Sequence, residues 1–384
     1  MLSNNIKMID FFTLLTPVYV SFFWSIVLFS KRLSARQFLS AFMLVASILY
    51  FGHALYFYQN YVVFTWYDAI YTFTSLSVYP MFYIYLRLLT FELKFQRKHY
   101  KHFIIPLIFF AATLISTLIM NQQERLDYFA YSIHSFPGES TASIIKFRYI
   151  TYYSSRIVFS LQVLFYLLMS IRVLRLHSKQ IREYYSNVDE KALLWVKILI
   201  VFFALTSFSS FFVNTIGKEI FVYNFNILIF PSLLFSILLF MIGYTGLKQK
   251  QVALEIMFDK KMDTNSKNQE EHLSDNEIIC KLKEAFELNM LHLDPDLKIW
   301  DVCIILKIDR LKLSNALKNV YDCDFSHYVN KIRCAEVQKI ILKSQNISLP
   351  ELVKKTGFDS QNAMIREYKK HYGKNLLSLI TKVR

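Results

Sequence analysis

The residues best suited to a specific chemistry lie near the end of the chain, between positions 349 and 373. Gln361, Asn362 and Arg366 recur there on one side of a predicted helix, and such side chains form paired hydrogen bonds with the edges of DNA bases in the major groove. Lysines beside them suit phosphate groups. The chemistry indicated is recognition of a nucleic acid, without a catalytic step.

Two helices are needed to position these side chains. Apolar residues at helical spacing predict a first helix, and they are Leu349, Leu352 and Val353. Gly357 supplies the turn, because glycine adopts backbone conformations that other residues avoid. Asp359 or Ser360 then caps a second helix, which buries Met364 and Tyr368 and presents the polar residues with Ile365.

A similar pair of helices precedes this one. A short helix at 300–306 and a turn at 307–308 lead to Asp309, which we expect to cap a helix from Arg310 to Tyr321. Its predicted buried stripe is Leu313, Leu317 and Val320. Its outward residues are Arg310, Lys312, Ser314, Asn315 and Lys318.

One helix at 325–344 connects the two pairs, and a helix at 276–289, capped by Ser274 or Asp275, precedes them. Two reading helices about 34 Å apart enter successive major grooves on one face of DNA. The sequence therefore predicts two helix-turn-helix units joined by a linking helix.

Residues 276–384 resemble the DNA-binding domain of the AraC/XylS family of bacterial transcription regulators. The resemblance rests on D-P-D-L at 294–297, L-S-N-A-L at 313–317, F-S-H-Y-V-N-K-I-R at 325–333 and G-F-D-S-Q-N-A-M-I-R-E-Y-K-K-H-Y-G at 357–373. Departures are Met364 where Phe is usual, Leu376 where Pro is common, and Asp322-Cys323 where a Gly often ends the first reading helix.

The resemblance implies which residues read bases: Leu311, Ser314, Asn315, Gln361, Asn362, Ile365 and Arg366. Cations suited to phosphates, which fix register without reading sequence, are Arg310, Lys312, Lys318, Lys369 and Lys370. For an isolated lysine, a solvated surface position is the simpler interpretation.

The rest of the chain has a different composition. The whole is 54% hydrophobic with 36 Phe and 25 Tyr, and the apolar residues crowd before position 247. Formal charge is +10 for 1–247, −1 for 248–275 and +6 for 276–384. All four cysteines follow position 247 and lack metal-ligand spacing, so we predict no metal, no cofactor and no disulfide framework.

Seven segments are long and apolar enough to span a bilayer. They are 10–29, 38–58, 68–89, 103–120, 149–173, 193–216 and 221–247. Connecting loops on one side collect thirteen basic residues and those on the other side five, which predicts an outer N-terminus and a cytoplasmic C-terminus. We therefore expect an all-α, multi-pass protein of the bacterial cytoplasmic membrane, with domains at 1–247 and 276–384.

Polar groups within the predicted spans gather toward the outer face. They define a candidate pocket for a small-molecule signal, made by His53, Asp68, Tyr153, Arg156, Asn214 and Asn226. In that interpretation Arg156 faces an anionic group. The simpler alternative has Arg156 extending to the membrane surface, Asp68 at the interface and the tyrosines in an aromatic belt.

The connector at 248–275 begins with a short amphipathic stretch and continues as a polar linker from 263 to 275. A flexible linker transmits conformational change poorly, so we expect any signalling to depend on proximity and on a homodimer.

The leading hypothesis is a membrane-bound transcription regulator whose partners are double-stranded DNA, the lipid bilayer and an unidentified small molecule. An alternative is a transporter or channel with a regulatory, DNA-binding-like cytoplasmic domain, which would favour paired ionisable residues at mid-membrane and internal repeats. We find neither in the sequence. An enzyme is not indicated, because no H-E-x-x-H motif and no Ser/His/Asp arrangement occurs.

Overall fold

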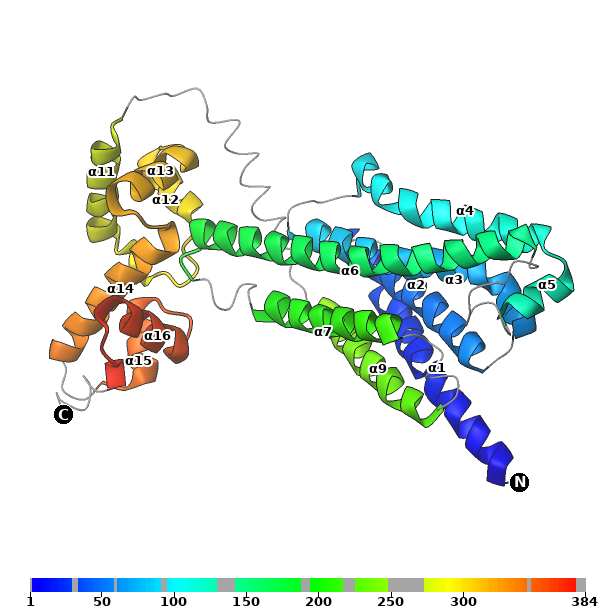
Figure 1. Cartoon of the computed structure of the whole chain (residues 1–384). Coiled ribbons are helices and arrows are strands. Elements are labelled where there is room, and N and C mark those ends of the chain that lie inside the picture. The colour runs from blue at the N-terminus through cyan, green and yellow to red at the C-terminus, as the bar shows by residue number, and fades with distance from the viewer. Residues whose placement is uncertain are drawn as a thin grey trace. The chain divides into compact units, whose positions relative to one another are not determined.

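The computed structural model describes residues 2–29, 34–58, 61–90, 95–129, 142–187, 194–216, 225–247, 273–343 and 347–377. In these residues the chain is all-helical and forms no strand, which confirms the all-α part of the predicted fold class (Figure 1). The predicted linker at 263–275 and the amphipathic stretch before it fall almost entirely outside them.

The chain divides into two compact units. The N-terminal unit comprises Met1–Val173 and Lys197–Gln249, and the C-terminal unit comprises Leu174–Val196 and Lys250–Arg384. This division differs from the predicted domains because it gives the segment at 174–196 and most of the connector at 248–275 to the C-terminal unit.

Over the described residues, nearly all of each predicted membrane segment is helical, and these helices belong mainly to the N-terminal unit. The helices are α1 (Leu2–Leu28), α2 (Ser34–Phe57), α3 (Tyr61–Thr90), η1 (Arg97–Phe103) continuing as α4 (Ile104–Ile119), α5 (Gln122–Asp127), α6 (Ser143–Tyr184), α7 (Leu194–Ile216) and α9 (Phe225–Leu247). At 42 residues α6 is much longer than the predicted span at 149–173 (Figure 1). Its last residues belong to the C-terminal unit.

Small and hydroxyl-bearing residues bring these helices together. The Ser40 hydroxyl on α2 donates to the Ser25 carbonyl on α1 at 2.6 Å, and the Tyr67 hydroxyl on α3 donates to the Ile48 carbonyl on α2 at 2.7 Å. A Cβ at Gly243 on α9 would lie 2.3 Å from the Trp24 ring on α1. Close backbone approach with hydrogen bonds between helices is typical of packing in membranes.

Large apolar side chains also face outward from these helices. On α4 alone the exposed ones are Ile104, Ile105, Leu107, Ile108, Ile115, Leu118 and Ile119. Exposed apolar surface on this scale indicates contact with lipid or another apolar partner.

Four helical stretches in the described part of the chain are long and apolar enough to cross a membrane. They are Ala35–Phe57, Arg97–Ile119, Ser143–Tyr184 and Ile229–Leu247. Phe12–Leu28 and Ile200–Thr215 are apolar but shorter, and α3 is not among the candidates. The membrane character agrees with the sequence, and the count of seven spans stays a prediction.

A buried ion pair joins α3 to α6. Arg148 donates to Asp68, and its guanidinium also donates to the Ser116 hydroxyl on α4 at 3.3 Å and lies 5.7 Å from the Tyr128 ring centroid. Arg148 lies on α6, which begins at Ser143 and so extends beyond the predicted span at 149–173. Both residues lie within about two turns of the first residue of their helices.

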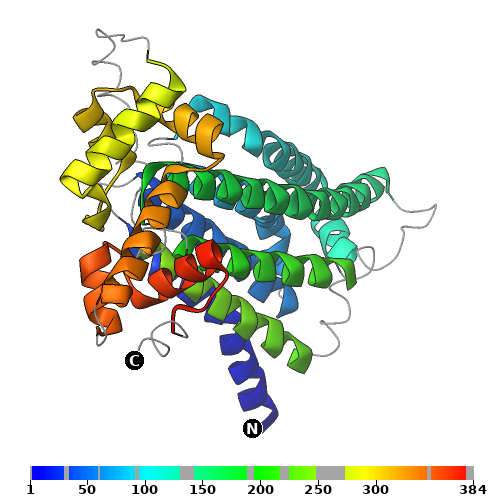
Figure 2. The ribbon, with the colours of Figure 1, turned by 90° about the vertical axis from the view of Figure 1, so that its left-hand side faces the viewer.

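The described helices of the C-terminal unit are α11 (Asp275–Asn289), η4 (Leu291–Leu293), α12 (Ile299–Leu306), α13 (Arg310–Tyr321), α14 (Phe325–Lys343), α15 (Leu349–Thr356) and α16 (Gln361–Tyr372), together with the end of α6. Two apolar clusters lie on α14. Phe325, Tyr328 and Val329 join the cluster of α11, α12 and α13, whereas Cys334, Val337 and Ile341 join that of α15 and α16. Figure 2 shows the ribbon of α14 between the yellow helices that precede it and the red helices that follow it.

Removal of Asp68 would leave Arg148 charged and unpaired in the protein interior. Breaking one side of a buried pair costs about 3–5 kcal/mol, while removing both charges costs much less. We expect Asp68→Ala to lower the thermal unfolding temperature of the detergent-purified full chain more than Asp68→Ala/Arg148→Ala does. The exposed control Gln123→Ala should change little. Additive losses in the double variant would show that the pair is not coupled.

Candidate nucleic-acid interface

The first helix-turn-helix unit is formed by α12 and α13. Lys307 ends α12 in the left-handed region, at φ 55°, and the Asp309 carboxylate accepts hydrogen bonds from the Leu311 and Lys312 amides at 2.7 and 3.2 Å. These contacts begin α13 where the sequence predicts. Asp322 ends α13 with φ 49°, a left-handed conformation that glycine adopts most readily.

The buried face of α13 agrees with the prediction at two of three positions. Leu313 and Leu317 are fully buried with Ala316, but Val320 is 38% exposed. In the last turn of α13 it is Tyr321, next to Val320, that packs against the same cluster.

The second unit is formed by α15 and α16. Backbone and side-chain hydrogen bonds from Ser348 lower the pKa of Glu351 and begin α15 as a reciprocal cap. Gly357 turns the chain at φ 73°, and the Ser360 hydroxyl accepts from the Ala363 amide at 3.2 Å. Ser360, not Asp359, is therefore the cap of α16. Met364 and Tyr368 are buried, as predicted.

The predicted DNA-contact residues lie mainly on the exposed faces of α13 and α16. Exposed ones are Leu311, Asn315, Lys318, Gln361, Asn362, Arg366, Lys369 and Lys370, and partly buried ones are Arg310, Lys312, Ser314 and Ile365. Each helix thus offers hydrogen-bonding and basic side chains to an external partner. Their roles in contacting bases or phosphates stay predictions.

Arg366 has an electrostatic partner in the free protein. Its guanidinium is 3.3 Å from the Glu367 carboxylate, and Lys370 is 3.7 Å from the same residue. The Arg366 side chain is 55% exposed, and surface ion pairs of this kind contribute about 0–1 kcal/mol. The pairing is weak enough to yield to a phosphate or a guanine.

An arginine that the pattern of DNA contacts does not include lies at the centre of the C-terminal unit. Arg333 on α14 is 0% exposed, and it donates from Nε to the His292 carbonyl at 2.7 Å and from a terminal nitrogen to the Asp294 carbonyl at 2.6 Å. Burial lowers the pKa of Arg333 to about 10, while Asp359 and Asp294 act in the opposite direction. The sequence did carry a signal for this buried arginine, because Arg333 lies at core spacing on α14, between Val329 and Val337.

These features define a double helix-turn-helix domain, a class of DNA-binding protein. Residues 302–378 match the family model described as a helix-turn-helix domain, which supports a DNA-binding domain of the AraC/XylS type over these residues. Comparison with curated proteins and with solved structures found no match.

The N-terminal unit contains a cavity of about 130 Å³. Four of the six predicted pocket residues line it, namely His53, Asp68, Arg156 and Asn214. Tyr152 lines it where the sequence predicted Tyr153, although both rings lie within 5.6 Å of the Arg156 guanidinium. The side chain of Asn226 lies outside the described residues.

Arg156 is held in place by neutral groups. It donates to the Asn214 carbonyl, and the Asn214 amide donates to the Arg156 carbonyl at 3.3 Å and to the Ser160 hydroxyl at 3.1 Å. Within the part of the chain that the structure describes, Arg156 forms no ion pair. Arg156 thus lies on the wall of the cavity.

The two left-handed glycines of the second unit provide a matched test of its packing. A Cβ at Gly357 would lie 2.3 Å from the His292 carbonyl oxygen, whereas nothing lies within 4 Å of a Cβ at Gly373. Both substitutions carry the conformational cost of about 1–2 kcal/mol. We expect Gly357→Ala to increase the susceptibility of the C-terminal unit to limited proteolysis. Gly373→Ala should change that susceptibility little. Equal effects would show that close packing at Gly357 is unimportant.

Proposed function

We propose that this chain is a membrane-bound, sequence-specific DNA-binding transcription regulator whose N-terminal helices sense a signal. The observation that supports this most directly is the pair of helix-turn-helix units, with exposed polar and basic faces, over residues that match a helix-turn-helix family. The outward apolar side chains of the N-terminal helices support a membrane location.

We further propose that the protein resides in the bacterial cytoplasmic membrane with its C-terminal unit in the cytoplasm. The asymmetry of basic residues between the connecting loops supports this orientation. A transporter or channel is less well supported, because the buried Asp68–Arg148 pair lies near the starts of α3 and α6 and not at their middle.

In the proposed complex, α13 and α16 enter successive major grooves. Gln361 and Asn362 suit adenine and Arg366 suits guanine, while Leu311, Ser314, Asn315 and Ile365 contact other base edges. The cations Arg310, Lys312, Lys318, Lys369 and Lys370 contact phosphates. A regulator of this kind needs no catalytic group, and we propose no enzymatic activity.

Arg366 and Lys369, both exposed on α16, distinguish base reading from phosphate contact. A duplex is first selected from a random-sequence library by the full chain in nanodiscs. Arg366→Ala should weaken the free energy of binding to this duplex by about 1–3 kcal/mol and relax the preference for one guanine. Lys369→Ala should lower the affinity for all DNA sequences alike. It should also reduce the slope of log affinity against log salt concentration by about 1.

Lys339→Ala, on the exposed side of α14, is the matched control and should leave binding unchanged. Binding of the unaltered protein that is absent or insensitive to salt would overturn the proposed function. An unchanged sequence preference in Arg366→Ala would overturn only the assigned role of that residue.

The cavity in the N-terminal unit is proposed as the site of the signal. Among the described residues that line it, the one carboxylate is Asp68, which is neutralised by Arg148, whereas Arg156 contacts the Asn214 carbonyl and the Tyr152 ring. The remaining wall is largely apolar, with Phe42, Leu49, Phe159, Phe203 and Leu239. A net positive, mostly apolar cavity favours a compact ligand with one anionic group.

Benzoate is a suitable probe, because its carboxylate matches Arg156 and its ring matches the apolar wall. Benzoate should raise the thermal unfolding temperature of the full chain, since a ligand that binds only the folded state stabilises it. Benzyl alcohol, which lacks the charge, should have little effect, and Arg156→Gln should remove the response. Equal stabilisation by the alcohol would contradict the assigned ligand class.

A further inference from the structure

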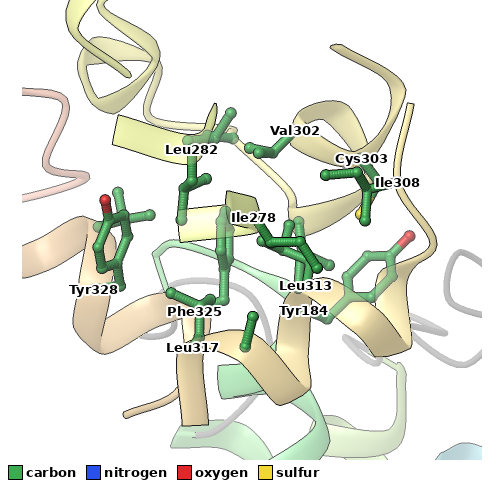
Figure 3. Close-up of a cluster of buried hydrophobic side chains, with 14 of the residues drawn as sticks. Tyr184, Ile278, Leu282, Val302, Cys303, Ile308, Leu313, Leu317, Phe325 and Tyr328 are labelled. Atoms are coloured by element: carbon green, nitrogen blue, oxygen red, sulfur yellow. The ribbon is translucent and has the colours of Figure 1, made fainter. Parts of the chain in front are cut away.

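The end of α6 forms part of the apolar core of the C-terminal unit. Ile181, Tyr184 and Tyr185 are buried in the same cluster as residues of α11, α12, α13 and α14. Figure 3 shows Tyr184 among Ile308 and Leu313 of the first helix-turn-helix unit. About 90 residues of chain separate this segment from α11, so the domain is assembled from two distant parts of the sequence.

The backbone after α6 is fixed by three contacts. Tyr185 pairs with Lys298 as an isolated antiparallel bridge, and the Ser186 amide donates to the Leu297 carbonyl at 3.1 Å. The Ser326 hydroxyl at the start of α14 donates to the Ser186 carbonyl at 2.9 Å. These contacts join the segment to the approach to α12 and to the linking helix.

The Asn187 side chain connects both helix-turn-helix units. Its amide nitrogen lies 2.8 Å from the Pro295 carbonyl before the first unit, and 3.0 and 2.8 Å from the Gly357 carbonyl and Asp359 carboxylate in the turn of the second. Its amide oxygen accepts from Arg333 on α14 at 2.6 Å. Donors and acceptors on opposite sides fix the orientation of the amide.

Arg333 depends on this segment for its remaining hydrogen bonds. Besides its bonds to the His292 and Asp294 carbonyls, the guanidinium donates to the Asn187 and Asn330 side-chain oxygens at 2.6 and 3.5 Å and to the Ser186 hydroxyl at 3.0 Å. A guanidinium has five N–H groups, so every one has an acceptor. Loss of the segment would remove two of those acceptors from a buried charge.

The predicted DNA-contact residues take no part in these contacts. The segment touches α12, α14 and the turn before α16, while the outer faces of α13 and α16 stay exposed. Docking therefore holds the two units without covering the surfaces that would meet DNA.

We propose that Ile181–Asn187 is a docking segment that fixes the separation of α13 and α16, and that the docked arrangement is the form that binds DNA. The second statement rests on the proposed function. Two recognition helices fit successive major grooves only at a defined spacing. A fixed separation of α13 and α16 therefore preorganises the C-terminal unit for DNA binding. The same helix carries Tyr152 and Arg156 of the cavity, which gives the signal a route that does not use the linker at 263–275.

The separation can be measured without DNA. Spin labels at Asn319→Cys on α13 and Lys374→Cys after α16, with Cys280→Ser and Cys323→Ser in every sample, report one distance in the full chain. The labelled protein that retains Asn187 should give a narrow distribution of distances between the two labels. Asn187→Asp should broaden it, because a carboxylate there would face the Pro295 and Gly357 carbonyls and the Asp359 carboxylate.

A paired change provides the decisive comparison. Asn187→Asp/Asp359→Asn restores a donor opposite the new carboxylate and keeps the contact with Arg333, so it should recover the narrow distribution. Affinity for the selected duplex should fall about tenfold or more in Asn187→Asp and recover in the pair, as expected for loss of buried hydrogen bonds to a charged group. Lys179→Ala, on the same helix with its side chain 58% exposed, is the control.

Failure of the pair to restore the distance distribution overturns the docking proposal, whether or not the single variant folds. A broad distribution with unchanged affinity overturns the assignment of the docked form as the DNA-binding form. Absence of DNA binding by the unaltered protein overturns the proposed function, and the distance measurement then still decides whether the segment docks.

Discussion

The buried guanidinium of Arg333 is the constraint on which the C-terminal unit depends. An arginine keeps its charge in the interior, and an unsatisfied charged donor there is costly, so its surroundings must supply acceptors. They come from η4, the approach to α12, α14 itself and the end of α6. One side chain therefore requires four parts of the chain to meet, and it does so at the junction of the two helix-turn-helix units.

This requirement explains why one linking helix can serve two cores. The first half of α14 packs with α11 to α13 and the second half with α15 and α16. Arg333 lies where the two halves meet, and Asn187 extends its hydrogen bonds to both sides. Apolar packing stabilises each helix-turn-helix unit by itself, whereas the directional polar contacts determine how one helix-turn-helix unit is placed against the other.

Much of the fold was predictable because its determinants are local. Helical spacing, Asp309, Gly357 and Gly373 locate both helix-turn-helix units from a few neighbouring residues. The candidate cavity was partly predictable, since polar side chains in apolar helices have few alternatives to facing inward. Contacts between distant residues were not: Asp68 and Arg148 are 80 positions apart and Asn187 and Arg333 are 146 apart, and neither pair has a local pattern.

The division of the C-terminal unit between two stretches of sequence affects the order in which the protein is made. The end of α6 leaves the ribosome long before α14 and Arg333 exist, because α7, α9, α11, η4, α12 and α13 are synthesised in between. Tyr184 and Tyr185 can pack against α11, α12 and α13 only after those helices have been made, and Asn187 can meet Arg333 only after α14 has been made. The C-terminal unit can therefore fold completely only after α14 has been synthesised and has packed against the end of α6. If translation stops before α14, the end of α6 is made but the complete unit cannot form.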